Sequence, residues 1–260
     1  MEIINIFKNK SRFSKNIYNK TKKILNYYGY DVSNSYDSKA ILNLVIGGDG
    51  TFLNAVRLSN FSSIPFVGIN TGHLGFYQEI DPENIEDFVK DFSKNNYSVE
   101  QLSLLESTIG KKIFNNVNEV VIKSNQNKLV RLKVFIDGIF VENFSGDGLI
   151  ISTPHGSTAY NLSSNGAILH QSLKGFQLTP IAPVFSSLAR SLKAPIILPQ
   201  DACIEILVSK RDSHHTVFIF DGREVSSNNF KIRVGVSDKK LKKLIFNKNH
   251  YWSNIKNKLL

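Results

Sequence analysis

The chain has 260 residues, an apolar fraction of 42% and a formal net charge of +10. This length is enough for one large domain or two small ones, and the composition excludes an intrinsically disordered chain. No apolar run approaches the about 18 residues of a membrane span, and the first ten residues lack the apolar stretch of a secretory signal. The single cysteine, Cys203, excludes an internal disulfide and a cysteine-built zinc site. We therefore expect a soluble cytoplasmic protein.

The positive charge is concentrated at the two ends of the chain. Residues 24–238 hold 18 basic and 21 acidic residues, so the excess of Lys and Arg lies before and after them. Lys outnumbers Arg by 25 to 7, although Arg is the better ligand for phosphates and base edges. We interpret the basic ends as solvated surface and expect no nucleic-acid partner. A nucleic-acid-binding module driven by this charge is the alternative interpretation.

The first part of the chain alternates between strand and helix patterns. Apolar runs predict strands at 2–7, 41–46 and 64–69, and three- and four-residue spacings predict helices at 13–28, 51–58 and 85–92. The first of these helices has its apolar face at Phe13, Ile17, Thr21, Ile24 and Tyr28 and ends at Gly29. The alternation predicts a parallel α/β, Rossmann-like domain over residues 1–97.

The second part is β-rich. Strands are predicted at 99–109, 113–122, 129–136, 139–144, 149–152, 203–208, 216–220 and 230–236, with one helix near Ala159. Asp137-Gly138 and Asp221-Gly222 are typical hairpin turns. We expect a sandwich-like domain over residues 98–240, with the ligand site between the two domains. Residues 241–260 have helical spacing and are expected to pack back on the first domain.

A glycine-rich turn after the strand at 41–46 carries most of the chemical information. Gly-Gly-Asp-Gly-Thr at residues 47–51 lets successive amides, and the positive end of the following helix, face a phosphate. It is not a Walker loop, since no Gly-Lys-Ser/Thr follows, and Leu53 occupies the third glycine position of the dinucleotide fingerprint. A tight turn would explain the glycines but not Asp49, which a phosphate would repel. Two roles fit Asp49: it holds a metal ion, or it accepts a proton from an attacking hydroxyl.

Four sequence blocks in order resemble the NAD kinase family. The Gly-Gly-Asp-Gly-Thr block is shared by NAD kinases, diacylglycerol kinases and related lipid kinases. Three more blocks resemble NAD kinases in particular: Asn-Thr-Gly-His-Leu-Gly-Phe at 70–76, Asn118-Glu119, and the long Gly146–Ser163 segment. The blocks span residues 47–163, and the α/β-then-β layout agrees with the family, so the resemblance covers nearly the whole chain.

The resemblance implies transfer of a phosphoryl group from ATP to the 2′-hydroxyl of the adenosine ribose of NAD, which gives NADP. Asp49 would be the catalytic base, and the phosphates of ATP would be bound by Gly47, Gly48, Gly50 and Thr51. The residues that bind NAD would be Asp49, Gly50, Phe76, Asn118, Glu119, Asp147, Thr158, Ala159, Tyr160, Asn161 and Ser163. NAD and ATP are the implied substrates, with Mg²⁺ or another divalent cation held largely by the ATP phosphates. The resemblance also implies a homodimer or homotetramer, with no membrane partner and no protein metal site.

Each role has a purely structural alternative. Asn118 would bind the adenine edge, Glu119 the two ribose hydroxyls and Asp147 the nicotinamide half of NAD. Without the family, Asn118 and Asp147 are ordinary turn residues, and Phe76 is a core residue instead of an adenine contact. Residues 158–162 are then just the start of a helix.

Three positions depart from the family pattern. His155 replaces a small hydroxylated residue, Ser145 replaces a basic residue, and Arg223 replaces a glutamine. These departures concern the nicotinamide side of the site and leave the reaction unchanged. Among the histidines, only His73, in the glycine-rich 70–76 block, is expected near the site.

The second candidate function is a lipid kinase, which shares residues 47–51 and would use its basic ends at an anionic membrane. The Asn118-Glu119 pair and the Gly146–Ser163 block favour an NAD kinase instead. The sequence leaves open whether ATP or polyphosphate is the preferred donor and whether NADH is also accepted.

Overall fold

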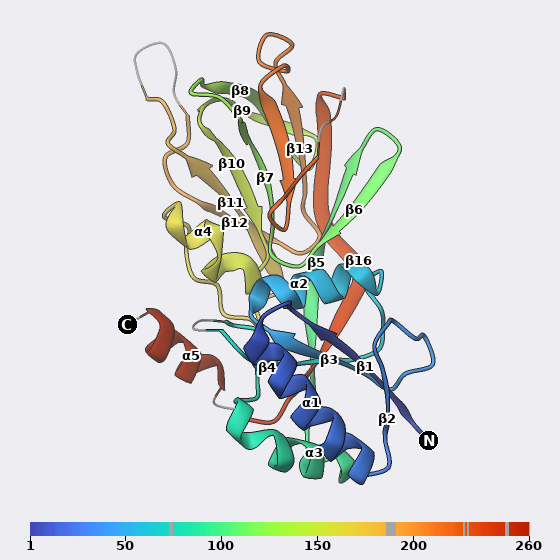
Figure 1. The fold of residues 1–260 in the computed structure, drawn as a ribbon. Coiled ribbons are helices and arrows are strands. Elements are labelled where there is room, and N and C mark those ends of the chain that lie inside the picture. Colours follow the sequence, from blue (N-terminus) through green and yellow to red (C-terminus); the bar gives the residue numbers. More distant parts are fainter. Residues whose placement is uncertain (73–74, 186–190, 226, 228, 248–249, 260) are drawn as a thin grey trace. The chain divides into compact units, whose positions relative to one another are not determined.

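The computed structural model describes residues 1–72, 75–185, 191–225, 227, 229–247 and 250–259. The chain divides into two compact units (Figure 1). The α/β unit consists of Met1–Gln101 together with Leu241–Leu260, and the β-rich unit consists of Leu102–Lys240. Among the described residues, no helix combines the length and the hydropathy that a membrane crossing requires.

The α/β unit is built on a parallel sheet. Its elements are β1 (Ile3–Lys8), α1 (Arg12–Tyr27), β2 (Asp31–Ser33), β3 (Leu42–Gly47), α2 (Asp49–Leu58), β4 (Phe66–Asn70), the short 3₁₀ helix η1 (Pro82–Asn84), α3 (Ile85–Ser93) and α5 (His250–Leu259). The strands run in the order β2-β1-β3-β4, and each neighbouring pair is parallel. The predicted parallel α/β fold is therefore confirmed.

Helices cover both faces of this sheet, which is why β3 is buried along its whole length. Leu42, Leu44 and Ile46 alternate along β3 and pack in one core with residues of α1 and α3. Helix α2 lies on the opposite side of the strands from α1 and α3 (Figure 1). The carboxyl end of β3 and the start of α2 are thus held rigidly, and the glycine-rich turn lies between them.

Three details of the α/β unit differ from expectation. The buried face of α1 consists of Ser14, Ile17, Thr21 and Leu25, whereas Phe13 is 51% exposed. Strand β2 was not predicted, because its three residues have no apolar alternation. Helix α2 begins at Asp49, two residues before the predicted start, so Asp49 is the first residue of the helix.

The β-rich unit contains most of the remaining strands. They are β6 (Lys112–Asn116), β7 (Glu119–Ser124), β8 (Val130–Ile136), β9 (Ile139–Gly146), β10 (Gly148–Ser152), β11 (Gly175–Ile181), β12 (Ile196–Pro199), β13 (Cys203–Val208), β14 (Thr216–Phe220) and β15 (Arg223–Val225). β5 (Ser98–Ile109) and β16 (Lys231–Ile245) have residues in both units. The short helices η2 (His155–Thr158) and α4 (Tyr160–Ser163) follow β10.

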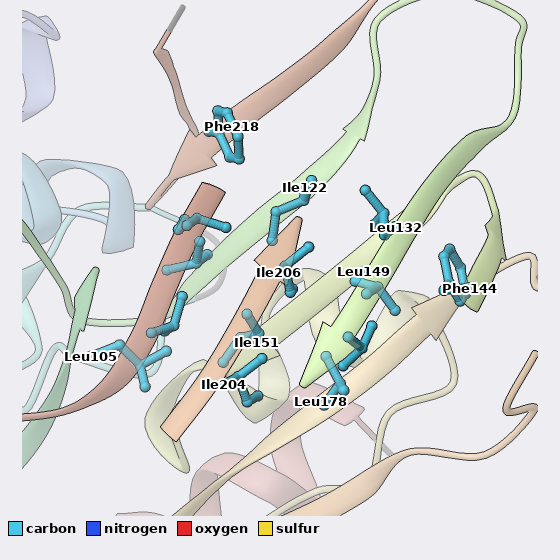
Figure 2. Packing of buried hydrophobic residues seen from close by; sticks show 14 of the residues in the cluster. Leu105, Ile122, Leu132, Phe144, Leu149, Ile151, Leu178, Ile204, Ile206 and Phe218 are labelled. Atoms are coloured by element: carbon cyan, nitrogen blue, oxygen red, sulfur yellow. The ribbon is translucent and has the colours of Figure 1, made fainter. Parts of the chain in front are cut away.

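Two antiparallel sheets enclose the core of this unit. One has the order β12-β11-β10-β7-β14-β15, and the other is the antiparallel part, β16-β13-β8-β9, of a mixed sheet that has ten strands among the described residues. Their inward-facing residues form one cluster, of which Figure 2 shows Ile122, Ile151 and Leu178 from the first sheet beside Leu132 and Ile206 from the second. This confirms the predicted β-rich, sandwich-like fold.

The single strand predicted at 113–122 is wrong, because the structure divides it at Val117 and Asn118. β6 pairs with β5, whereas β7 pairs with β10 and β14. The sequence analysis also missed β11, which contains Pro180, and the four-residue β12. Pro180 is tolerated because β12 pairs only with residues 175–178 of β11, so the missing N–H disrupts no pairing on that side.

Candidate functional site

Asp49 lies where the glycine-rich turn becomes a helix. Gly47 is the last residue of β3, Gly48 is the N-cap of α2 in an extended conformation, and Asp49 follows it. The first amides of a helix have no partner within the helix and carry the positive end of its dipole. The turn therefore presents amide donors at the point where the sequence predicts phosphate binding, and a carboxylate stands among them.

The carboxylate of Asp49 is oriented by the backbone of the 70–76 block and the residue after it. Its Oδ2 accepts a hydrogen bond from the Phe76 amide at 2.9 Å, and its Oδ1 accepts one from the Tyr77 amide at 3.1 Å. Burial raises the pKa of Asp49 above its ordinary value, although the two amides, Lys258 and Lys243 act in the opposite direction. The group is thus a fixed carboxylate that is more basic than an exposed one.

Two glycines near Asp49 have different physical roles. A Cβ added at Gly75 would collide with the side chain of Gln78 and lie 2.9 Å from Asp49 Oδ1, so a larger residue would displace the carboxylate. A Cβ added at Gly50 would meet no atom within 4 Å. Packing therefore explains Gly75 but not Gly50, which is exposed at the start of α2 and leaves room for a ligand against the backbone.

Phe76 and Lys258 are close to Asp49, and α5 supplies the second of them. The Lys258 ammonium lies 5.0 Å from the centre of the Phe76 ring. Its charge favours the ionised form of Asp49. Phe76 is half-buried and is not part of the apolar core, which leaves part of its ring accessible. Sequence analysis did not identify Lys258, because a lysine in a lysine-rich tail has no distinguishing pattern.

A cavity of about 620 Å³ in the α/β unit also borders Lys258. Its other charged lining residues are Glu79, Asp81, Asp87 and Asp91. Four carboxylates would repel a phosphate group. We therefore do not assign this cavity to either nucleotide.

In the β-rich unit, Asn118 and Glu119 lie at the break between β6 and β7. The two residues are 7% and 6% exposed. The backbone around them is held from two sides: Asp221 accepts hydrogen bonds from their amides, while Thr153 donates to the carbonyl oxygens of Val117 and Asn118. The backbone of this polar pair is therefore held in a defined position, although the pairing between β5 and β6 ends before it.

Glu119 carries a buried carboxyl group with an unusual proton affinity. Burial, and to a smaller extent the nearby charge of Asp221, raise its pKa to about 8. Its Oε2 is buried and has no hydrogen-bond partner among the described residues. Buried polar atoms without partners are costly, and a ligand hydroxyl would satisfy this one.

The segment after β10 packs directly against this pair. A Cβ at Gly156 would collide with the carbonyl of Asn118, so only glycine allows this approach. Thr158 and Ala159 are half-buried, whereas Tyr160 and Ser163 are exposed. The fully buried Asn161 donates to the carbonyls of Ser157 and Ala167 and accepts from Thr179. Its amide group is used within the protein, so we expect Asn161 to shape the turn.

Asp147 and Tyr160 line the same pocket, whose volume is about 440 Å³. Lys123 and Lys128 also line it, and the Lys123 ammonium lies 5.8 Å from the centre of the Tyr160 ring. These two lysines were not predicted from the sequence. They place positive charge beside two predicted NAD-binding residues. The backbone amide of Ser145 donates to the Ser191 hydroxyl, which in turn donates to the Ser145 carbonyl.

The predicted residues are divided between the two units. The first contains Gly47, Gly48, Asp49, Gly50, Thr51 and Phe76, and the second contains Asn118, Glu119, Asp147, Thr158, Ala159, Tyr160, Asn161 and Ser163. His155 is buried in η2, and Arg223 is exposed on β15. His73 lies outside the described residues. Within the described ranges, no three His, Cys, Asp or Glu side chains are grouped as metal ligands.

Two family models together match most of the chain. The ATP-NAD kinase N-terminal domain matches residues 2–97, and the ATP-NAD kinase C-terminal domain matches residues 117–246.

Individual NAD kinases and an NADH kinase are also similar to this chain in sequence or in fold. An NAD kinase from Finegoldia magna is 42% identical over 100% of this chain and 98% of its own. One from Leuconostoc mesenteroides is 34% identical over 82% of each. Among solved structures, yeast NADH kinase complexed with NADH has a TM-score of 0.88 at 22% identity, covering 100% of this chain and 87% of its own. An Archaeoglobus fulgidus NAD kinase in complex with ATP has a TM-score of 0.80 at 23% identity, covering 98% and 99%. The two structures support the fold.

Proposed function

The chain belongs to the NAD kinase family and phosphorylates NAD to NADP, and we propose that it uses ATP as the donor and Asp49 as the general base. Asp49 takes the proton of the 2′-hydroxyl of the adenosine ribose as that oxygen attacks the terminal phosphorus of ATP. The phosphorus–oxygen bond to ADP breaks, and ADP leaves. The observation that carries this proposal is the orientation of the Asp49 carboxylate at the glycine-rich start of α2.

The surroundings of Asp49 suit a general base. The amides of Phe76 and Tyr77 occupy one lone pair on each carboxylate oxygen, so each oxygen keeps a second lone pair for a hydroxyl proton. Because burial raises its pKa, the carboxylate is a stronger base than an exposed aspartate. A base whose pKa lies closer to the working pH transfers protons more effectively.

The donor phosphates are proposed to lie at the start of α2. Gly48 and Gly50 present backbone amides there, and the helix dipole adds positive potential. Phosphoryl transfer depends mainly on positioning and on stabilisation of phosphate charge, which amides supply. The Archaeoglobus fulgidus structure was determined with ATP, which supports ATP as the donor here.

NAD is proposed to bind through the polar pair in the β-rich unit. The Asn118 amide matches the donor and acceptor pattern of an adenine edge, and the unpartnered Glu119 oxygen matches a ribose hydroxyl. Tyr160 and Asp147 line a pocket with Lys123, which suits the rest of the dinucleotide with its phosphates.

A divalent cation is expected to accompany ATP. The described residues contain no group of metal ligands, so the phosphate oxygens of ATP would hold it, and it would offset their negative charge. We also expect a homodimer or homotetramer, which light scattering would test.

The decisive experiment replaces Asp49 by Asn. This change keeps the size of the side chain but removes the proton acceptor, so we expect NADP formation from NAD and ATP to fall at least about 10²-fold. The control is Asp37→Asn, since Asp37 is also half-buried in the α/β unit and accepts a backbone amide, that of Lys39, at 2.8 Å. Its turnover should stay near that of the wild type.

The same assay tests donor and acceptor. ATP is compared with polyphosphate, and NAD is compared with NADH. Wild-type turnover in a folded Asp49→Asn protein would refute the general base, and NADP formed only from polyphosphate would refute ATP as the donor.

A further inference from the structure

Asp221 is the residue that connects a hairpin turn to the polar pair. Its Oδ2 accepts from the Val117 amide at 2.7 Å, and its Oδ1 accepts from the amides of Asn118 and Glu119 at 2.8 and 3.2 Å. Three consecutive amides thus converge on one carboxylate. Hydrogen bonds to a charged acceptor are stronger than neutral ones, and they hold the backbone where β6 ends and β7 begins.

The position of Asp221 is itself fixed by the turn between β14 and β15. Asp221 and Gly222 have φ values of +45° and +75°, as in the tight turns that Asp-Gly pairs favour. The Asp221 amide donates to the Glu119 carbonyl at 3.1 Å. The preceding Phe220 stacks on Phe114 with a centroid distance of 4.4 Å. The turn, this hydrogen bond and the ring stacking therefore hold the Asp221 carboxylate in a fixed position.

The carbonyl side of the same backbone is held separately. Thr153 donates its hydroxyl to Val117 O at 2.7 Å and its amide to Asn118 O at 2.9 Å. The carboxylate of Asp221 therefore binds the amides of residues 117–119, while Thr153 binds the carbonyls of Val117 and Asn118.

We propose that Asp221 is a positioning residue for NAD binding: its carboxylate holds the backbone that presents Asn118 and Glu119 to the adenosine half of the dinucleotide. This inference rests on the proposed role of the pair in NAD binding. Asp221 uses its hydrogen bonds within the protein, so it acts through the pair and does not contact the substrate itself. Removing its charge should therefore weaken NAD binding and leave ATP binding unchanged.

The test compares two Asp-to-Asn substitutions in equivalent turns. Asp221→Asn keeps the turn, since Asn also suits a left-handed conformation, but it loses the charge and turns an N–H₂ group towards amides that need an acceptor. Asp137→Asn is the matched control. Asp137 also has a positive φ before a glycine in a hairpin of the same unit, but its carboxylate accepts the amide of Cys203 instead.

We expect Asp221→Asn to raise KM for NAD about 10-fold or more, in line with the loss of charge-assisted hydrogen bonds. KM for ATP should change less than about twofold, and Asp137→Asn should change neither constant. Thr153→Val, which removes the hydroxyl donor on the carbonyl side, should also raise KM for NAD selectively and provides a second variant if Asp221→Asn folds poorly.

The outcomes separate this inference from the proposed function. If Glu119→Ala raises KM for NAD but neither Asp221→Asn nor Thr153→Val does, the positioning role is wrong and the proposed function stands. An equal rise of both KM values in Asp221→Asn would show a general structural effect and would also overturn it. If Asn118→Ala and Glu119→Ala both leave KM for NAD unchanged, the proposed role of the pair fails, and this inference fails with it.

Discussion

At the scale of single residues, the two proposed functional carboxyl groups differ in their surroundings. Asp49 is half-buried, and it accepts two amide hydrogen bonds and lies in the electrostatic field of two lysines. For Glu119, burial and then the nearby carboxylate of Asp221 raise the pKa to about 8. At pH 7 Glu119 is therefore mainly protonated in the free protein, whereas Asp49 has partners that favour its charge.

The raised pKa of Glu119 leads to a prediction about how the stability of the fold depends on pH. Between an ordinary pKa of 4.5 in the unfolded chain and about 8 in the folded protein, the folded state holds a proton that the unfolded state has lost. Stability therefore falls as the pH rises through this window. Glu119→Gln stays neutral, so its Tm relative to the wild type should increase from pH 5 to pH 9, by on the order of several degrees. Thermal unfolding at both pH values measures this.

The control is Glu106→Gln, a half-buried glutamate on β5. Its Tm difference from the wild type should show no comparable increase with pH. A constant Tm difference for Glu119→Gln across the whole range would contradict the raised pKa.

The same variant also tests ligand binding. Glu119→Gln should raise KM for NAD more than KM for ATP, because its amide replaces the carboxyl group proposed to meet the ribose. Equal losses in both constants would argue against the ribose role.

At the scale of elements, the position of helix α5 affects the electrostatic field at Asp49. α5 follows β16 near the end of the chain, yet its Lys258 acts on Asp49, which begins α2. The ammonium favours the carboxylate form and thereby lowers the pH at which the base becomes available. The helix thus contributes an electrostatic effect that no motif in its own sequence indicates.

We expect Lys258→Met to move the acidic limb of the kcat/KM profile towards higher pH. Without the lysine charge, Asp49 holds its proton to a higher pH, so activity should fall more at pH 6 than at pH 8. Lys256→Met is the matched control, since Lys256 is an exposed residue on the same helix. Profiles with the same acidic limb in both variants would contradict the electrostatic role.

At the scale of the whole molecule, the net charge of +10 does not indicate the function. The basic excess lies at the ends of the chain, whereas almost all of the proposed site residues come from the central part with its 18 basic and 21 acidic residues. Membership of the NAD kinase family argues against both the lipid kinase and the nucleic-acid-binding alternatives.

Ligand-dependent stability distinguishes these classes. NAD or NADP at a hundred times its Kd should stabilise the protein by about 2.7 kcal/mol, which is several degrees of Tm. Diacylglycerol micelles should leave Tm unchanged. Stabilisation by the micelles alone, or tight DNA binding with a steep salt dependence at physiological salt, would contradict this prediction.

The sequence by itself determined the class of the fold and the chemistry of its principal motif. Periodicity indicates the buried strands and amphipathic helices because their burial repeats every two or every three to four residues. Gly-Gly-Asp-Gly-Thr indicates phosphate chemistry because few other residues leave backbone amides so accessible. These are local properties, which neighbouring residues determine on their own.

Only the tertiary structure decided which distant residues act on the site. The break at Val117 and Asn118 was not predicted, because it depends on hydrogen bonds with Asp221 of a different hairpin and with Thr153. β11 was missed because the effect of Pro180 depends on where its neighbouring strand ends. Lys258 and Asp221 influence Asp49 and Glu119 through space, and electrostatic and hydrogen-bond effects follow distance in the folded chain instead of distance along the sequence.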